Sequence, residues 1–452
     1  MFRIKYFFFI FLLIILSIKS YSIELVRDVE LEEFTKELLL PLTRTSNLRD
    51  GRIELYFIKS NQVNAFVTSG QNIFINTELI IQSETYDEYL GVLAHELAHI
   101  NGSHISRTKE QISTLTEKSI PIYLLGILGM LEGNMDAGLA ALMVGSASVQ
   151  DGYLYYSRTQ EAAADQAAIT LLCKSSQPPG GLESFLKKLD RSTIKNAEEY
   201  KYKTTHPLIS DRFNWIKNSY KKYPNCKSKL NTSLQERFEL IKAKLLAYTH
   251  NENEVFAIYD NEVSQNSTYA YAVTYYFNGN HSKSIELIKS LIAKNSKNPY
   301  YHELLGEIYF SKGRFNLAIQ EQKKAMKLAA HENDLYLMML GSYLLADPNV
   351  NNILESIDVL NRSLFLNRYN SYAWYLLAKA YASSDNLSLA YYASAERYYL
   401  RRDMTLALSF AKKAIKNIDK DTVEWYRTND LLQLIVGIEE KDNKNSSKDT
   451  EQ

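Results

Sequence analysis

The chain has 452 residues, of which 46% are hydrophobic, and its 52 Lys and Arg residues balance 52 Asp and Glu residues. A chain of this length and composition is expected to form two or three domains and is not disordered as a whole. The balanced charge argues against nucleic acid or an anionic surface as the main partner.

Residues 1–22 have the pattern of a secretory signal peptide. Two basic residues lie within the first five, residues 6–16 are almost purely apolar, and Ser20 and Ser22 supply the small residues of a cleavage site. The apolar run is shorter than the about 20 residues that a transmembrane helix needs, although an uncleaved anchor is the alternative. We therefore expect the mature chain to be exported to an oxidising compartment.

The chain has two cysteines, Cys173 and Cys226. An oxidising compartment permits a disulfide between them, and the even number of cysteines agrees with one. The alternative is two buried thiols, because the sequence alone does not show whether their Cα atoms approach each other.

The next segment predicts a helix followed by a small sheet. Apolar residues recur at helical spacing in 31–40, and β-like runs follow at 52–58, 64–67 and 72–75. The last two runs flank a turn at Gly70, which predicts a hairpin. One of these strands could form an exposed edge to which an extended peptide adds as a further strand. Alternatively, the sheet serves only as part of the core of an α+β domain.

A His-Glu-x-x-His motif lies in the next predicted helix, 88–104. Its residues are His95, Glu96 and His99, in an apolar run with no Gly or Pro between the histidines. Residues four apart share a helix face, so both histidines can reach one cation, and Glu96 can reach a water molecule beside it. In zinc hydrolases two neutral imidazoles hold the metal, which acidifies the water so that a carboxylate can take its proton. The motif therefore predicts a zinc-dependent hydrolase.

Two features that follow the motif leave alternatives open. A metzincin would place a third histidine at position 105, but that residue is Ile105. His104 is therefore interpreted as a surface histidine or a neighbour of the site rather than a ligand. Residues 120–149 hold two apolar runs, each about half as long as a membrane span. They predict either a buried helical hairpin of the first domain or a lid that contacts a membrane.

The Ala-rich stretch 157–168 is strongly helical and carries Glu161 and Asp165 on one face. Carboxylates on such helices are usually solvated, but the motif needs a third ligand from another helix, and Glu161 is the best candidate. Asp165, one turn further on, is placed to accept a hydrogen bond from a ligating imidazole. Two histidines and a glutamate leave zinc the open position that catalysis requires. His206, which precedes Pro207, is by its position alone a plain loop histidine.

Taken in order, these motifs resemble the gluzincin family that includes HtpX, the CAAX prenyl protease and the periplasmic BepA-type proteases. The resemblance covers most of residues 50–215. It rests on the signal peptide, Asn64-Ala65-Phe66 before a Gly turn, His95-Glu96-x-x-His99, Glu161-x-x-x-Asp165 and His206-Pro207. HtpX and the prenyl protease carry several transmembrane spans, whereas this chain has no full-length apolar span after the signal. It is therefore most similar to the soluble BepA-type branch.

The resemblance implies an α+β minigluzincin protease domain that binds one zinc ion per chain. The implied zinc ligands are His95, His99 and Glu161. Glu96 is implied as the general base, and Asp165 as the partner of a ligating histidine. The resemblance also implies that His206 lies near the metal, where it either stabilises the oxyanion or holds an inactive, latched state.

From about residue 231 the chain becomes helical with a period of 34 residues. Tyr275, Tyr309 and Tyr343 are 34 residues apart, and another unit begins at Trp374. This period is typical of the tetratricopeptide repeat (TPR), whose paired helices stack into a solenoid with a concave surface. The repeats also match the layout of the BepA-type proteases.

The sequence thus predicts a mainly α fold with a small sheet, in which an α+β protease domain precedes an all-α TPR solenoid. The expected parts are a signal peptide at 1–22, a zinc metalloprotease domain at 23–230, a TPR domain at 231–436 and a charged, disordered tail at 437–452.

By resemblance, we expect a zinc metalloendopeptidase of the periplasm with chaperone-like activity, in quality control and assembly of outer-membrane proteins. The expected partners are unfolded or stalled outer-membrane proteins and, through the TPR domain, the outer-membrane assembly machine. Residues 120–149 could add a peripheral membrane contact. The alternative is a TPR assembly scaffold or chaperone whose protease site is mostly latched.

Overall fold

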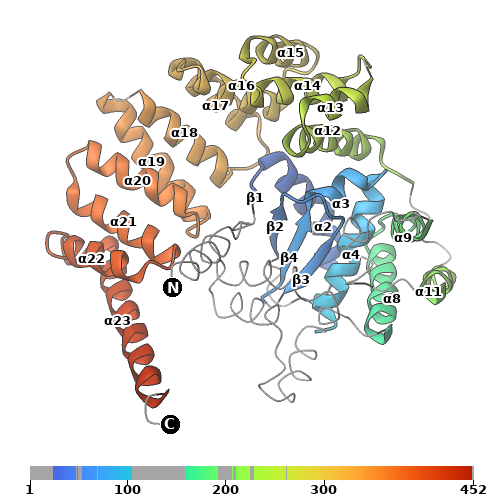
Figure 1. Ribbon diagram of the computed structural model, residues 1–452, viewed down its shortest axis with the longest axis horizontal. Coiled ribbons are helices and arrows are strands. Elements are labelled where there is room, and N and C mark those ends of the chain that lie inside the picture. The colour runs from blue at the N-terminus through green and yellow to red at the C-terminus, as the bar shows by residue number, and fades with distance from the viewer. Residues whose placement is uncertain are drawn as a thin grey trace, which may run out of the picture. The chain divides into compact units, whose positions relative to one another are not determined.

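The computed structural model describes residues 24–46, 48, 53–68, 70–103, 158–191, 206, 210–223, 226, 229–260, 262–347 and 349–449. The predictions for 1–22, His104 and 120–149 lie outside these residues. The described chain is mainly helical with one four-stranded sheet, as the sequence predicts (Figure 1). Among the residues that are described, no helix is long and apolar enough to cross a membrane.

The contacts within the chain define two compact units. Unit 1 consists of Met1–Arg27 and Glu32–Phe238, and unit 2 consists of Asp28–Leu31 and Glu239–Gln452. Unit 1 contains the sheet and the His-Glu-x-x-His motif, and the 34-residue repeats lie in unit 2.

The sheet of unit 1 has the strand order β1-β2-β4-β3. The strands are β1 (Leu25–Val26), β2 (Glu54–Ile58), β3 (Ala65–Thr68) and β4 (Asn72–Asn76). β2 runs parallel to β4, and β3 pairs antiparallel with β4, which confirms the predicted hairpin. Its turn contains Gly70 at a φ of +85°, which glycine adopts without steric cost. Of the described strands, β3 lies at one end of the sheet.

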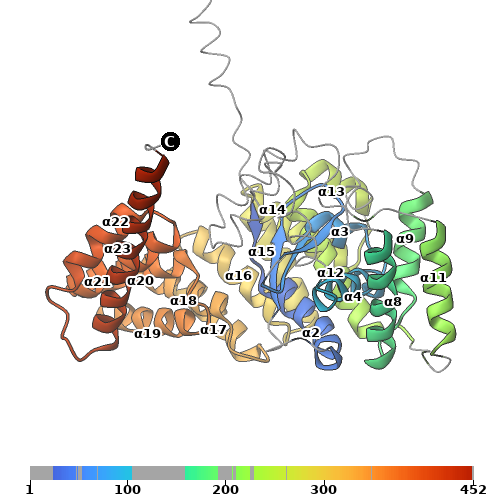
Figure 2. The same ribbon diagram turned by 90° about the horizontal axis from the view of Figure 1, so that it is seen from below.

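Six helices of unit 1 are described: α2 (Val29–Thr45), α3 (Thr77–Gln82), α4 (Tyr86–Asn101), α8 (Arg158–Lys174), α9 (Gly181–Arg191) and α11 (Ser210–Lys221). α4 carries the motif and packs against β3, α8 and α9 (Figures 1 and 2). Every residue of α4 from Glu88 to His99 is buried. The motif helix is therefore central to unit 1, which explains its high content of Leu, Val and Ala.

α9 fixes the start of α4 through two kinds of contact. Glu88 accepts hydrogen bonds from Ser184 Oγ at 2.7 Å and from Lys188 Nζ at 2.6 Å. The two backbones also meet at glycines. A Cβ atom on Gly181 would lie 1.8 Å from the carbonyl oxygen of Asp87, and one on Gly91 would lie 2.4 Å from the backbone nitrogen of Leu182. The helices can approach this closely only because both positions lack side chains.

We expect Gly181→Ala to destabilise unit 1, because the added methyl group meets backbone that cannot move aside without shifting α4. Overpacking of this kind costs about 1–3 kcal/mol or more. Thermal unfolding of purified protein should show a Tm lower by at least about 2 °C. The matched control is Gly180→Ala, since a Cβ there has no heavy atom within 4 Å. Equal Tm values for the two variants would contradict the close packing.

The structure contains the disulfide between Cys173 and Cys226, and the alternative of two thiols is wrong. Cys173 lies in the last turn of α8, and Cys226 lies five residues after the end of α11. The bond therefore joins the region after α11 to the helix that carries Glu161 and Asp165.

The described part of unit 2 is entirely helical. Its helices are α12 (Thr232–Thr249), which begins in unit 1, α13 (Glu252–Tyr259), α14 (Gln265–Phe277), α15 (His281–Lys294), α16 (Pro299–Ser311), α17 (Phe315–Leu328), α18 (Asp334–Ala346), α19 (Val350–Leu366), α20 (Ser371–Ser383), α21 (Leu387–Leu400), α22 (Met404–Ala414) and α23 (Val423–Asp449). Consecutive helices pack as pairs from α14 to α21, and neighbouring pairs stack in chain order (Figure 1). This is the arrangement that the 34-residue repeat predicts.

Equivalent residues of the repeats make equivalent contacts. Ser284 donates a hydrogen bond across its helix pair to the carbonyl of Ala272, and Ser356 donates one to the carbonyl of Gly341. Tyr343, one of the repeated tyrosines, is fully buried. The repeated small and aromatic residues thus serve helix packing.

The C-terminus differs from the expectation for residues 437–452. α23 continues to Asp449 where the sequence composition predicts a disordered tail. After Gly437 the segment contains neither Gly nor Pro, and its Glu and Lys residues favour helix. Extending an existing helix requires no new nucleus, so the segment continues the helix that begins at Val423.

Candidate metal centre

α4 places both histidines of the motif at one buried point. The Nε2 atoms of His95 and His99 lie 3.0 Å apart, and both side chains are fully buried. Glu96 is also fully buried, and neither of its carboxylate oxygens is hydrogen-bonded within the described part of the chain. Helical spacing accounts for the shared direction of the two imidazoles.

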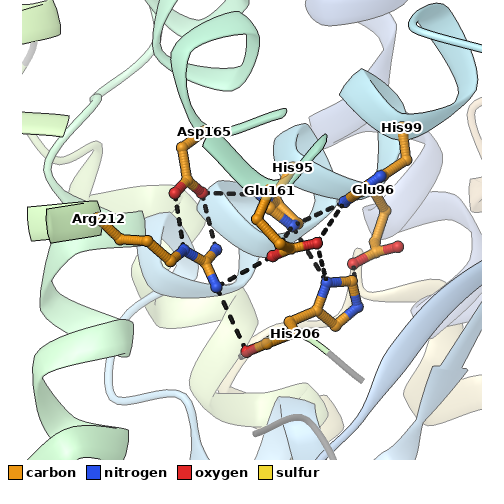
Figure 3. A network of polar contacts seen from close by, with 7 residues as sticks. All are labelled: His95, Glu96, His99, Glu161, Asp165, His206 and Arg212. Atoms are coloured by element: carbon orange, nitrogen blue, oxygen red, sulfur yellow. Dashed lines mark hydrogen bonds and ion pairs between the residues drawn. The ribbon is translucent and has the colours of Figure 1, made fainter. Parts of the chain in front are cut away.

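α8 brings its two carboxylates to the same point (Figure 3). Glu161 Oε1 lies 3.2 Å from His99 Nε2, and its Oε2 lies 3.4 Å from His95 Nε2. Asp165 Oδ1 lies 2.9 Å from Nδ1 of His95, on the far side of that ring from the other histidine. The contact with Asp165 orients the His95 ring so that Nε2 points into the cluster.

His206 completes the cluster, although its position before a proline predicts only a loop histidine. Its Nδ1 lies 3.3 Å from His95 Nε2 and 3.1 Å from Glu161 Oε1. Its Nε2 lies 3.4 Å from Oε1 of Glu96. The His206 ring is therefore between the ligand-type atoms on one side and the Glu96 carboxylate on the other (Figure 3).

These side chains fit a metal ion. One ligand atom from each of His95, His99, Glu161 and His206 lies within 4.8 Å of the other three. The short separations, 3.0 to 3.3 Å, approach the about 3.3 Å between ligand atoms of a tetrahedral zinc site. Imidazole nitrogen and carboxylate oxygen are also donors that zinc accepts.

The charge of the site favours a divalent cation as well. The site contains three buried carboxylates (Glu96, Glu161, Asp165) and one buried guanidinium (Arg212), which pairs with Glu161 and Asp165. With neutral imidazoles this leaves an excess of negative charge that is costly to bury uncompensated. One divalent cation would balance it.

The pKa values of the motif residues follow from the same surroundings. Burial opposes charge on His95, but Glu161 and Asp165 outweigh it and raise its pKa to about 9. Burial lowers the pKa of His99 well below its usual range. Burial also raises the pKa of Glu96, although the neighbouring histidines oppose this shift. The carboxylates around His95 thus stabilise positive charge, and a cation bound there would take the place of the proton.

The sequence analysis did not single out Arg212. This fully buried residue of α11 bonds Asp165 through Nε (2.7 Å) and Nη2 (2.8 Å). Its Nη1 lies 3.0 Å from Oε2 of Glu161 and 3.4 Å from the carbonyl oxygen of His206. The only sequence signal was an arginine six residues after His206, which indicates no role by itself.

An α+β unit with a buried His-Glu-x-x-His helix and a glutamate from a second helix is the arrangement of a metallopeptidase. Residues 27–219 match the model of Peptidase family M48. The chain therefore carries a peptidase family M48 domain, and with its metal-binding cluster it is a metallopeptidase.

Relatives extend the similarity beyond this domain. The "Beta-barrel assembly-enhancing protease" of Escherichia coli (strain K12) is 24% identical over 431 residues, which are 93% of this chain and 86% of the relative. The "Putative beta-barrel assembly-enhancing protease" of Vibrio cholerae is 23% identical over 63% of this chain and 59% of its own. A "Protease HtpX homolog" of Acaryochloris marina is 26% identical over 52% of this chain and 82% of its own. The similarity to the first relative thus includes both units.

Proposed function

We propose that this protein is a periplasmic zinc endopeptidase with chaperone-like activity in the quality control and assembly of outer-membrane proteins. The observation that carries the peptidase activity is the buried cluster of His95, His99 and Glu161 with Glu96 beside it. The name of the E. coli relative, which is similar over both units, supports the role in assembly. The signal-peptide pattern of residues 1–22 supports the periplasm.

His95, His99 and Glu161 would hold one zinc ion, which supplies a Lewis acid and an acidified water molecule. Asp165 accepts a hydrogen bond from Nδ1–H of His95 and so keeps Nε2 unprotonated and available as a ligand. Glu96 takes the proton of the attacking water and passes it to the leaving amine nitrogen. Glu96 is suited to this role by its position, because it is fully buried beside the ligand-type side chains and neither of its oxygens is hydrogen-bonded within the described chain.

The substrate would bind as an extended peptide on β3. β3 is at the end of the described sheet and packs against α4, which carries Glu96. An extended chain can pair its backbone with such an edge strand, so its sequence matters less than its lack of structure. This mode suits unfolded or stalled outer-membrane proteins. The helix pairs of unit 2 would bind the client or the outer-membrane assembly machine.

The second candidate is an assembly scaffold whose peptidase site is latched, and the position of His206 favours it. With Nδ1 among the ligand-type atoms, His206 occupies the place that a water molecule or substrate would need. Its Nε2 also faces Glu96, the group that would receive the proton. In the active state His206 would leave this place and could then stabilise the oxyanion.

Cleavage of an unfolded outer-membrane β-barrel protein tests the proposal. The purified protein should cleave it, a chelator should stop cleavage, and added zinc should restore it, whereas a folded soluble protein should be cleaved more slowly. His206→Ala should be faster than the native protein if His206 acts as a latch, and slower if it mainly stabilises the oxyanion. If neither the native protein nor His206→Ala shows chelator-sensitive cleavage, the proposed peptidase activity is refuted.

A further inference from the structure

We propose that Arg212 is a positioning residue of the metal centre. It aligns both carboxylates of α8 and holds the backbone of His206, so that α11 sets the ligand geometry although it supplies no ligand. This inference rests on the proposed metallopeptidase function.

Arg212 binds Asp165 through two of its nitrogens. Nε and Nη2 of the guanidinium bind the two oxygens of Asp165 at 2.7 and 2.8 Å. A planar guanidinium fixes the plane of a carboxylate that it binds with two nitrogens. Asp165 Oδ1 also lies 2.9 Å from Nδ1 of His95. Arg212 therefore controls the ring orientation of His95 through Asp165.

The remaining nitrogen of the Arg212 guanidinium, Nη1, contacts Glu161. It lies 3.0 Å from Glu161 Oε2, while Oε1 of the same carboxylate lies 3.2 Å from His99 Nε2 and 3.1 Å from His206 Nδ1. The guanidinium thus engages one oxygen of Glu161 and orients the other toward the ligand cluster. Oε1 is therefore the oxygen of Glu161 that Arg212 does not engage, while Oε2 also lies 3.4 Å from His95 Nε2.

Nη1 of Arg212 also donates to the carbonyl oxygen of His206 at 3.4 Å. A single side chain therefore contacts the carboxylate ligand, the partner of His95 and the backbone of the histidine that faces both the cluster and Glu96 (Figure 3).

A purely structural role for Arg212, as a link between α8 and α11, explains these contacts less well. The Cys173–Cys226 disulfide already joins α8 to the segment after α11, and Tyr223 Oη donates to Thr170 Oγ1 at 3.3 Å in the same region. These ties lie away from the ligands, whereas all three nitrogens of Arg212 point into the site. Burying a full positive charge also costs free energy, and packing alone would not offset that cost.

The test compares Arg212→Lys and Arg212→Gln with native protein, using Co²⁺ alone as the probe. Lysine keeps the charge but cannot bind two carboxylates in a fixed plane. We expect Arg212→Lys to bind Co²⁺ roughly 10–100-fold more weakly, as for other partners of metal ligands. Its visible Co²⁺ absorption band should change, and kcat should fall with little change in KM. Arg212→Gln should show a larger loss.

Tyr223→Phe is the matched control, because it removes an α8 contact of the same region without touching the site. It should retain native Co²⁺ affinity and absorption. Far-UV circular dichroism and Tm, measured without metal, report whether each variant is folded. A folded Arg212→Lys with native Co²⁺ affinity and absorption would overturn the proposal. So would a Tyr223→Phe variant whose loss of affinity equals that of Arg212→Lys.

A double variant gives an independent readout. The double variant carries both Arg212→Lys and Asp165→Asn. If Arg212 acts through Asp165, the Co²⁺ affinity of the double variant should be only slightly lower than that of the single variant with the lower affinity. Fully additive losses would contradict that route. The proposed function fails separately, namely if native protein itself binds no Co²⁺ and shows no chelator-sensitive cleavage.

Discussion

Glu96→Gln is expected to lower kcat for peptide cleavage by roughly 10²–10⁴-fold, the contribution of a positioned general base. The amide has the same shape as the carboxylate but cannot accept the proton from water. The fold should be unchanged, because neither oxygen of Glu96 is hydrogen-bonded within the described chain. Metal content should also be unchanged, since Glu96 is not part of the four-residue cluster. Single-turnover cleavage, metal analysis and Tm check these three statements.

The same variant separates the two candidate functions in cells. If proteolysis is the main activity, cells with Glu96→Gln should show the envelope defects of cells without the protein. If they are as competent as native cells, assembly scaffolding by unit 2 is the main role. Cleavage by Glu96→Gln within about tenfold of native would show that another group is the base.

Glu161→Ala is expected to have the largest effect on metal binding. It removes the carboxylate oxygen of the cluster and also leaves Nη1 of Arg212 without its buried partner Oε2. Zinc affinity should fall by more than the roughly 100-fold upper range for loss of a ligand's partner. Competition with a chromogenic chelator measures this loss directly.

Two matched variants make the comparison sharp. Asp165→Asn should weaken zinc by roughly 10–100-fold, because it perturbs His95 without removing a ligand. Glu183→Ala, on α9, removes only the ion pair with Lys187 and should bind zinc normally. Should Glu161→Ala retain one zinc ion at native affinity, the third ligand must be another residue.

The parts of the molecule that depend on local periodicity could be predicted from the sequence. The motif helix follows from helical spacing around His95 and His99, the hairpin from apolar runs around Gly70, and the helix pairs from tyrosines 34 residues apart. In each case the pattern and the element that it predicts lie in the same stretch of the sequence.

The parts that depend on contacts distant in sequence were less accessible. Glu161 could be selected only because the motif needs a ligand from another helix. Arg212 could not be selected at all, because its bonds to Asp165 connect residues 47 apart on different helices. The C-terminal segment differs for another reason, since its charged composition suits both disorder and the extension of a preceding helix.

The disulfide also bears on when the site can form during the life of the protein. The loop it closes contains both His206 and Arg212, and a cross-link of this span removes about 3–5 kcal/mol of entropy from the unfolded chain. Thiols stay reduced in the cytosol, so a newly made chain lacks this advantage until it meets an oxidant. If the chain is exported as proposed, oxidation would favour assembly of the peptidase site in the oxidising compartment.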